Sequence, residues 1–261
     1  MKISGIKQLL WHANQLNLFR FFEYSKAVQF LELAKSDLRD AQSLQLLDVG
    51  TGPSILPSFL ASYYNVSVIC GDIYATTLTY QRSSFQKVEL DNFIGISLDA
   101  QALPFRDSSF DRVVSISVIE HVQNDTAAIT EMVRVLKPDG ILVLSFPFSY
   151  KPREARGMLD MGWYYIFHKK RKSFFQRYYH PLEFIRLVHQ IGANVETYAL
   201  FDGLIMKLSR IIPPGLFLYK DYLFYKLYER FGLASAVPTS NVAEGIMIIK
   251  VRKTTIGTHV S

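Results

Sequence analysis

The sequence contains a single cysteine, Cys70, among 261 residues, which excludes a fold held together by disulfides. No run of about 18 apolar residues occurs, so we expect no membrane-spanning helix. The first 22 residues lack both a continuous apolar core and a small-residue cleavage site, so we expect no secretion signal. No cluster has metal-ligand spacing, and we predict no metal site. These absences favour a cytoplasmic protein in a reducing compartment.

The chain does have an alternation of apolar strands and amphipathic helices. At 49% hydrophobic residues, a chain of this length can bury a substantial core. The apolar runs are continuous, as strands covered on both faces require, and helical periodicity separates them. This order predicts an α/β fold, a Rossmann-like doubly wound, mostly parallel seven-stranded sheet with helices on both faces. The expected strands are 45–49, 65–72, 93–99, 110–118, 141–148, 193–200 and 245–253.

We expect one domain over the whole chain. Residues 1–43 form its N-terminal helical region and residues 45–148 its cofactor-binding core, and two insertions after the fifth strand, 151–180 and 203–240, form a substrate cap. The insertion 151–180 holds eight basic and two acidic residues, so its charge of +6 equals the net charge of the chain. Basic and aromatic residues together fit single-stranded nucleic acid, an anionic membrane surface, or a solvated lid helix packed on the core.

The second insertion is apolar and aromatic. Within LFLYKDYLFYKLYERF, 216–231, aromatic residues cover most of a helical wheel, so no single apolar face emerges. A helix that is apolar all round is buried in protein or in an apolar environment. Both a cap over an apolar pocket and peripheral membrane contact through 151–180 and 203–240 fit this pattern. Either arrangement favours a hydrophobic substrate.

The stretch LLDVGTGPS carries a glycine turn directly after the first strand. Gly50 and Gly52 allow a tight turn and close approach of a ligand. A dinucleotide loop has a third glycine, which this turn lacks, and Asp48 adds a negative charge that suits a pyrophosphate badly.

Two further carboxylates follow later strands. Asp72 ends the second strand twenty residues after Gly52, a spacing at which a carboxylate binds ribose hydroxyls. Asp99, followed by Ala100, could accept a hydrogen bond from an exocyclic amine while leaving room for a flat ring. Because ligands of open parallel sheets bind beyond the carboxyl ends of the strands, these residues together predict a nucleoside site.

Four blocks over residues 45–148 carry a family resemblance: LLDVGTGPS, GDIY, DAQALPFRDSSFDRVVSISVIEHV and VLKPDGILVLSFP. In this order they resemble the class I S-adenosylmethionine-dependent methyltransferases, and most of all the small-molecule and lipid methyltransferases of type 11. Ser54 departs from the pattern, since many members carry glycine there. The resemblance implies S-adenosyl-L-methionine as cofactor, with the glycine turn at its methionine part, Asp72 at the ribose and the Asp-Ala pair at the adenine. The implied cofactor-binding residues are Asp48, Gly50, Thr51, Gly52, Asp72, Ile73, Asp99, Ala100 and Ser117.

Methyl transfer is an in-line displacement that depends on alignment, and some acceptors also need a base. Glu120 and His121, just past the fourth strand, are the candidate catalytic residues, with His121 as the base or orienting group. The alternative is that this histidine only packs near the cofactor. Weaker candidates come from the first insertion: His168, Tyr178, Tyr179 and His180.

The leading functional hypothesis is methyl transfer to an oxygen, carbon or nitrogen of a small or lipid-linked molecule. Nucleic acid is disfavoured as a partner, because SVIEH stands where amino methyltransferases of bases carry [DN]-P-P-[YFW]. A binding protein that keeps the methyltransferase fold without catalysis is an alternative. A nicotinamide-dependent reductase is a further one, disfavoured by the missing third glycine and by Asp48.

Overall fold

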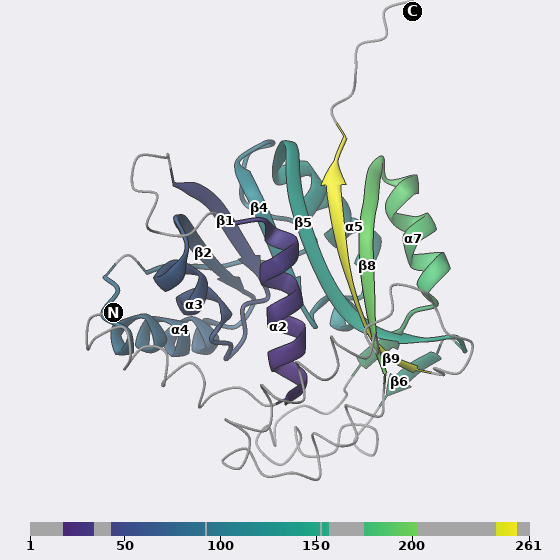
Figure 1. Cartoon of the computed structure of the whole chain (residues 1–261), viewed down its shortest axis with the longest axis horizontal. Coiled ribbons are helices and arrows are strands. Elements are labelled where there is room, and N and C mark those ends of the chain that lie inside the picture. Colours follow the sequence, from purple (N-terminus) through teal and green to yellow (C-terminus); the bar gives the residue numbers. More distant parts are fainter. Residues whose placement is uncertain are drawn as a thin grey trace, which may run out of the picture.

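A computed structural model describes residues 18–33, 43–91, 93–151, 153–156, 175–202 and 244–254. Its centre is a seven-stranded sheet in the order β3-β2-β1-β4-β5-β9-β8 (Figure 1). The sheet confirms the predicted fold class. Its strands are β1 (Leu44–Val49), β2 (Val66–Asp72), β3 (Ile94–Ser97), β4 (Phe110–Ile116), β5 (Leu136–Ser149), β8 (Ala193–Asp202) and β9 (Glu244–Lys253).

The order of the strands reverses at β1. This strand pairs in parallel with β2 on one side and with β4 on the other. Only β9 runs against its neighbours, since it pairs antiparallel with both β5 and β8. A reversal of this kind leaves a crevice at the carboxyl ends of the two flanking strands, which is where open parallel sheets bind ligands.

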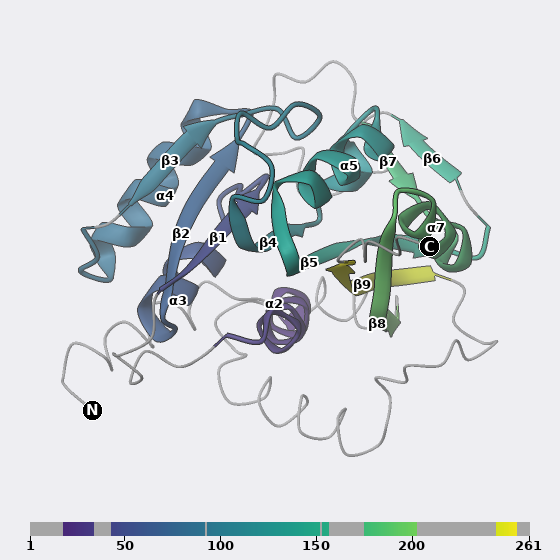
Figure 2. The same cartoon turned by 90° about the horizontal axis from the view of Figure 1, so that it is seen from above.

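Helices cover both faces of the sheet (Figure 2). The helices α2 (Leu18–Leu31), α3 (Leu56–Tyr63) and α4 (Ala75–Lys87) contribute to one hydrophobic cluster. The helices α5 (Asp125–Val135) and α7 (Pro181–Gln190) contribute to the other. Successive residues of a strand point to opposite faces, so Leu46 belongs to the first cluster and Leu47 to the second.

Pro53 is suited to a first helical turn, so the sequence predicts that the helix after β1 starts near this residue. That prediction is wrong, because the helix begins at Leu56. The carbonyl groups of Gly52 and Ser54 accept hydrogen bonds from Gln81 Nε2, at 2.8 and 2.7 Å. The side chain of Gln81 thus holds this segment in a turn, and Pro57 takes the place in the first helical turn that favours proline.

The first insertion contributes a hairpin that the sequence pattern does not predict. Strands β6 (Arg153–Arg156) and β7 (Phe175–Tyr178) pair antiparallel outside the main sheet. The rest of both insertions, residues 152, 157–174 and 203–240, lies outside the described residues, as do residues 1–17 and 34–42 of the expected N-terminal helical region. The substrate cap and the aromatic stretch 216–231 therefore stay predictions. No helix within the described ranges is long and apolar enough to cross a membrane.

Candidate functional site

The glycine turn after β1 is bound directly to the end of β2. The backbone N–H groups of Gly50 and Thr51 both donate to the carbonyl of Gly71, at 2.8 and 2.9 Å. Gly50 has φ of +74°, and a Cβ at this position would lie 2.5 Å from the methyl groups of Val118. The turn needs glycine here for two reasons, since the backbone is left-handed and the neighbouring side chain leaves no space.

Asp72, at the end of β2, holds the other side of the turn. Its carboxylate accepts from the backbone N–H of Gly52 at 2.9 Å and from that of Tyr74 at 2.8 Å. A carboxylate has about four acceptor positions, so ribose hydroxyls could still bind to it. The next residue, Ile73, is 60% exposed and offers an apolar surface at the same edge of the sheet.

Asp48 is buried beneath the turn. The hydroxyl of Thr51 donates to its carboxylate at 2.9 Å. Burial raises the pKa of Asp48 to about 7; the hydrogen bond from Thr51 opposes this rise and the charge of Asp72 adds to it. A cation bound nearby would favour the ionised form of this carboxyl group at neutral pH.

Asp99 and Ala100 follow β3 at the same edge of the sheet. Ser97 pairs with Asp72 in the β2–β3 register, and Asp99 lies two residues further on. The exposed carboxylate of Asp99 accepts from the backbone N–H of Gln101 at 2.9 Å, whereas Ala100 is buried. The structure thus brings the predicted residues from the ends of β1, β2 and β3 together, as the parallel sheet requires.

Ser117 joins a buried polar cluster that the sequence analysis missed. Its hydroxyl donates to Glu23 Oε1 at 2.9 Å and accepts from Arg20 Nη1 at 3.1 Å. Glu23 is fully buried, forms an ion pair with Arg20 at 2.5 Å, and also accepts from the hydroxyl of Ser145. Helix α2 therefore brings an arginine and a carboxylate to the end of β4 and to the neighbouring part of β5. The available signal was a pair of opposite charges, three residues apart, in the aromatic first half of the helix.

Glu120 and His121 belong to a 3₁₀ turn, η1 (Ile119–His121), after β4. Glu120 is buried, and its Oε2 makes no hydrogen bond among the described residues. Burial raises the pKa of Glu120 to about 8. The side chain of His121 is 39% exposed, with Nε2 at 3.8 Å from Glu120 Oε1. Glu120 is thus a buried acid with an unused oxygen beside the cluster around Glu23.

The stability of the protein should report the protonation of Glu120. Between its ordinary pKa of 4.5 and the raised value of about 8, the folded carboxyl group keeps a proton that the unfolded chain releases. This contribution to stability is therefore fully present below pH 4.5 and is lost as the pH rises through about 8.

The substitution Glu120→Gln removes this titration. The measured quantity is the difference in melting temperature between the variant and the wild type. We expect this difference to be about 5 °C more positive at pH 8.5 than at pH 5, because only the wild type loses stability over this range. Thermal unfolding at both pH values measures the difference. The matched control is Glu89→Gln, the same change on an exposed side chain. An equal pH dependence for both variants would contradict the assignment of a buried, protonated Glu120.

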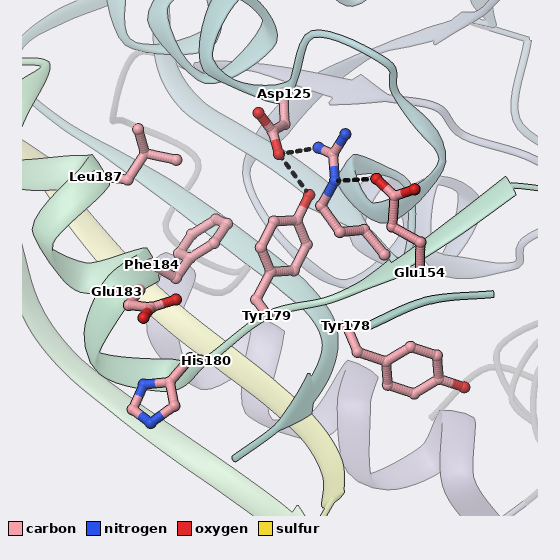
Figure 3. A pocket seen from close by; sticks show the side chains of 9 residues that line it. Asp125, Glu154, Tyr178, Tyr179, His180, Glu183, Phe184 and Leu187 are labelled. Atoms are coloured by element: carbon pink, nitrogen blue, oxygen red, sulfur yellow. Dashed lines mark hydrogen bonds and ion pairs between the residues drawn. The ribbon is translucent and has the colours of Figure 1, made fainter. Parts of the chain in front are cut away.

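Of the remaining candidates from the first insertion, the three within the described residues do not lie at the glycine turn. His168 is outside the described residues. Tyr178, Tyr179 and His180 line a groove of about 520 Å³ between the β6–β7 hairpin, the start of α5 and the helix α7 (Figure 3). None of the residues that line this groove comes from the ends of β1, β2 or β3.

The residues at the strand ends fit a cationic cofactor that contains a nucleoside. A Cβ on Gly52 would meet no atom nearer than 3.8 Å, so the turn is open on its outer side. Buried Asp48 favours a cation, and Ile73 gives a ring an exposed apolar surface. This sheet order, with a glycine turn after β1 and carboxylates at the following strand ends, defines the class I methyltransferase fold.

Comparison with known proteins also indicates a methyltransferase. Residues 47–144 match the family model described as a methyltransferase domain. The chain is 24% identical over 212 residues, 80% of its own length and 83% of the relative's, to the ubiquinone biosynthesis O-methyltransferase of Rickettsia typhi. It is 32% identical over 116 residues to the ubiquinone/menaquinone biosynthesis C-methyltransferase UbiE of Pseudoalteromonas translucida, 44% of this chain and 46% of that one. Residues 47–144 therefore form the methyltransferase domain of an S-adenosylmethionine-dependent enzyme.

A solved structure shares the fold. The geranyl diphosphate C-methyltransferase of Streptomyces coelicolor, in complex with Mg²⁺, geranyl diphosphate and S-adenosylhomocysteine, superimposes with a TM-score of 0.62 at 12% identity. The match covers 88% of this chain and 77% of that one. At this identity the likeness concerns the fold alone, and the choice of acceptor depends on the residues of each chain.

Proposed function

We propose that this enzyme methylates a hydrophobic, lipid-like small molecule, with a hydroxyl oxygen as the acceptor atom. The observation that carries the choice of oxygen is Glu120, a buried carboxyl group with an unused oxygen and a raised pKa. Val118, two residues earlier, lies against the glycine turn, so Glu120 is close to the proposed cofactor site. The relative that covers four-fifths of this chain acts as an O-methyltransferase of ubiquinone biosynthesis, which supports both the atom and the lipid-like acceptor.

We propose the following roles at the cofactor. Gly50, Thr51 and Gly52 hold its methionine part above buried Asp48. Asp72 and Ile73 bind the ribose, and Asp99 and Ala100 flank the adenine. Arg20, fixed by Glu23 and Ser117, places a cation at the same edge, suited to the carboxylate of the methionine part. When bound, S-adenosylmethionine supplies an electrophilic methyl group on a sulfonium.

The residues of η1 act on the acceptor. A hydroxyl group becomes a better nucleophile as it loses its proton, and the ionised form of Glu120 accepts that proton at Oε2. A carboxylate whose pKa is about 8 is a stronger base than an ordinary one, because burial disfavours its charged form. His121, exposed beside it, orients the acceptor oxygen. The main contribution to rate then comes from holding oxygen, methyl carbon and sulfur in line.

Methyl transfer from labelled S-adenosylmethionine tests this proposal. In a cell extract, we expect the labelled methyl group to enter the lipid fraction and not the aqueous fraction. We also expect the enzyme to label an alkylated catechol, used as a probe acceptor. Binding of S-adenosylhomocysteine, measured first by thermal shift, should raise the melting temperature by about 5 °C or more at 100 times its Kd, whereas NADH should leave it unchanged.

The three functional hypotheses give different outcomes in these assays. Product binding without transfer to any fraction would indicate a binding protein and contradict the proposal. Transfer confined to aqueous metabolites would contradict the hydrophobic acceptor. Stabilisation by NADH alone would favour the reductase.

A further inference from the structure

Strand β7 of the first insertion is bound to the loop that carries Glu120 and His121. The hydroxyl of Tyr179, directly after β7, lies 3.2 Å from the carbonyl oxygen of Ile119 and 3.0 Å from Asp125 Oδ2. These two contacts are at the two ends of one segment, because η1 begins at Ile119 and α5 begins at Asp125. A single phenol group therefore bridges the start and the end of the loop, and Figure 3 shows its contact with Asp125.

Arg177 adds a second attachment from β7. Its guanidinium pairs with the carboxylate of Asp125 and donates to the carbonyl of Gln123 at 3.2 Å. Glu154, on the neighbouring strand β6, lies 3.9 Å from the same guanidinium and so ties it to the hairpin. The loop is thus held at three points, Ile119, Gln123 and Asp125, by side chains from the hairpin.

Tyr179 is itself fixed to the main sheet. Its backbone N–H donates to the carbonyl of Pro147 at 3.2 Å, and its own carbonyl accepts from the N–H of Ser149 at 2.9 Å. Its ring packs edge-on between Phe146 and Phe184, with centroids at 5.1 and 4.9 Å. The position of the hydroxyl is therefore set by β5 and α7. Burial, and then the charge of Asp125, raise the pKa of Tyr179 above its ordinary range, so the phenol stays a hydrogen-bond donor.

We propose that Tyr179, Arg177 and Asp125 are positioning residues for methyl transfer, which hold the Ile119–Gln123 loop and so align Glu120 and His121 with the acceptor. This inference rests on the proposed role of Glu120. It gives the β6–β7 hairpin a function beyond covering the sheet, since the first insertion sets the geometry of the acceptor side. The cofactor side depends on the glycine turn and Asp72, and these contacts of the hairpin do not reach it.

The test compares Tyr179→Phe, which removes only the hydroxyl, with Tyr198→Phe. Tyr198 packs half-buried against the same hydrophobic cluster, and its hydroxyl has no hydrogen bond within the described residues. We expect Tyr179→Phe to speed amide exchange in peptides covering residues 119–125 by about tenfold. With an alkylated catechol as probe, kcat should fall by about tenfold while the KM for S-adenosylmethionine stays within about twofold. Tyr198→Phe should leave all three quantities as in the wild type.

A second pair of variants tests Arg177. Arg177→Met should change amide exchange and kcat in the same way as Tyr179→Phe. Arg177→Lys, which keeps the charge, should recover part of kcat. The control is Arg186→Met, on an exposed side chain of α7.

Unchanged amide exchange at residues 119–125 in Tyr179→Phe and Arg177→Met would overturn the inference. An equal loss of kcat in the control variants Tyr198→Phe and Arg186→Met would overturn it as well. The exchange experiment needs no acceptor. An inactive wild type therefore contradicts the proposed function, whereas unchanged exchange contradicts only the positioning role.

Discussion

Asp72→Ala is expected to weaken the binding of S-adenosylhomocysteine by about 100-fold. The carboxylate accepts hydrogen bonds from the backbone N–H groups of Gly52 and Tyr74, and alanine leaves both without this acceptor. An unsatisfied donor costs about 1–3 kcal/mol where it is buried, and these groups are partly so. Part of this cost falls on binding, because the turn must be held in place to bind the cofactor, and the loss of a ribose acceptor adds to it. A combined loss of about 3 kcal/mol corresponds to about two powers of ten in affinity.

Isothermal titration with S-adenosylhomocysteine measures this change, with thermal unfolding as a check on the fold. Asp72→Asn keeps one acceptor oxygen and should lie between the wild type and Asp72→Ala. The control is Asp91→Ala, which removes the same charge from an exposed side chain. Equal affinities for Asp72→Ala and Asp91→Ala would show that the carboxylate takes no part in the cofactor site.

The region around Asp72 shows how far the sequence predicts this site. Asp72 stands at the end of an apolar strand, and the parallel sheet brings the ends of β1, β2 and β3 to one edge. The spacing of twenty residues from Gly52 predicts a ribose acceptor, which stays a prediction, and the structure adds a direct hydrogen bond between the two residues. Local pattern cannot show that both carboxylate oxygens already serve backbone groups. That detail depends on how the turn closes in three dimensions.

Contacts between distant parts of the chain are the ones that the sequence does not predict. Glu23 meets Ser117 and Ser145 across 94 and 122 residues, and Tyr179 meets Ile119 across 60. Each contact depends on where a helix or a hairpin packs. The periodicity of a single sequence predicts which elements form but not where they pack. The predicted start of α3 is wrong for a similar reason, because Gln81, 27 residues beyond Ser54, binds the segment that precedes the helix. Residues that hold the glycine turn or the Ile119–Gln123 loop in place are therefore missed more readily than the residues of the turn itself.

Gly50→Ala is the second change for which we expect a large effect. A left-handed backbone costs a residue with a side chain about 1–2 kcal/mol, and the new Cβ would also lie 2.5 Å from the methyl groups of Val118. Overpacking of this kind costs about 1–3 kcal/mol. We expect a free energy of unfolding lower by about 3 kcal/mol and no measurable binding of S-adenosylhomocysteine. Chemical denaturation and calorimetric titration measure the two effects.

Gly192→Ala separates the two causes, because Gly192 has φ of +79° and a Cβ there would meet no atom within 4 Å. This variant should show the backbone cost alone, about 1–2 kcal/mol, and keep its affinity for S-adenosylhomocysteine. Val118→Ala should then restore part of the stability and affinity of Gly50→Ala, since it removes the two methyl groups that the new Cβ would meet. The coupling between the two substitutions should be about 1–2 kcal/mol. Strictly additive effects would mean that Val118 does not press on the turn. A measured coupling would show that the turn at the cofactor and the segment leading to Glu120 are packed as one unit, so that a shift in either one misaligns both partners of the reaction.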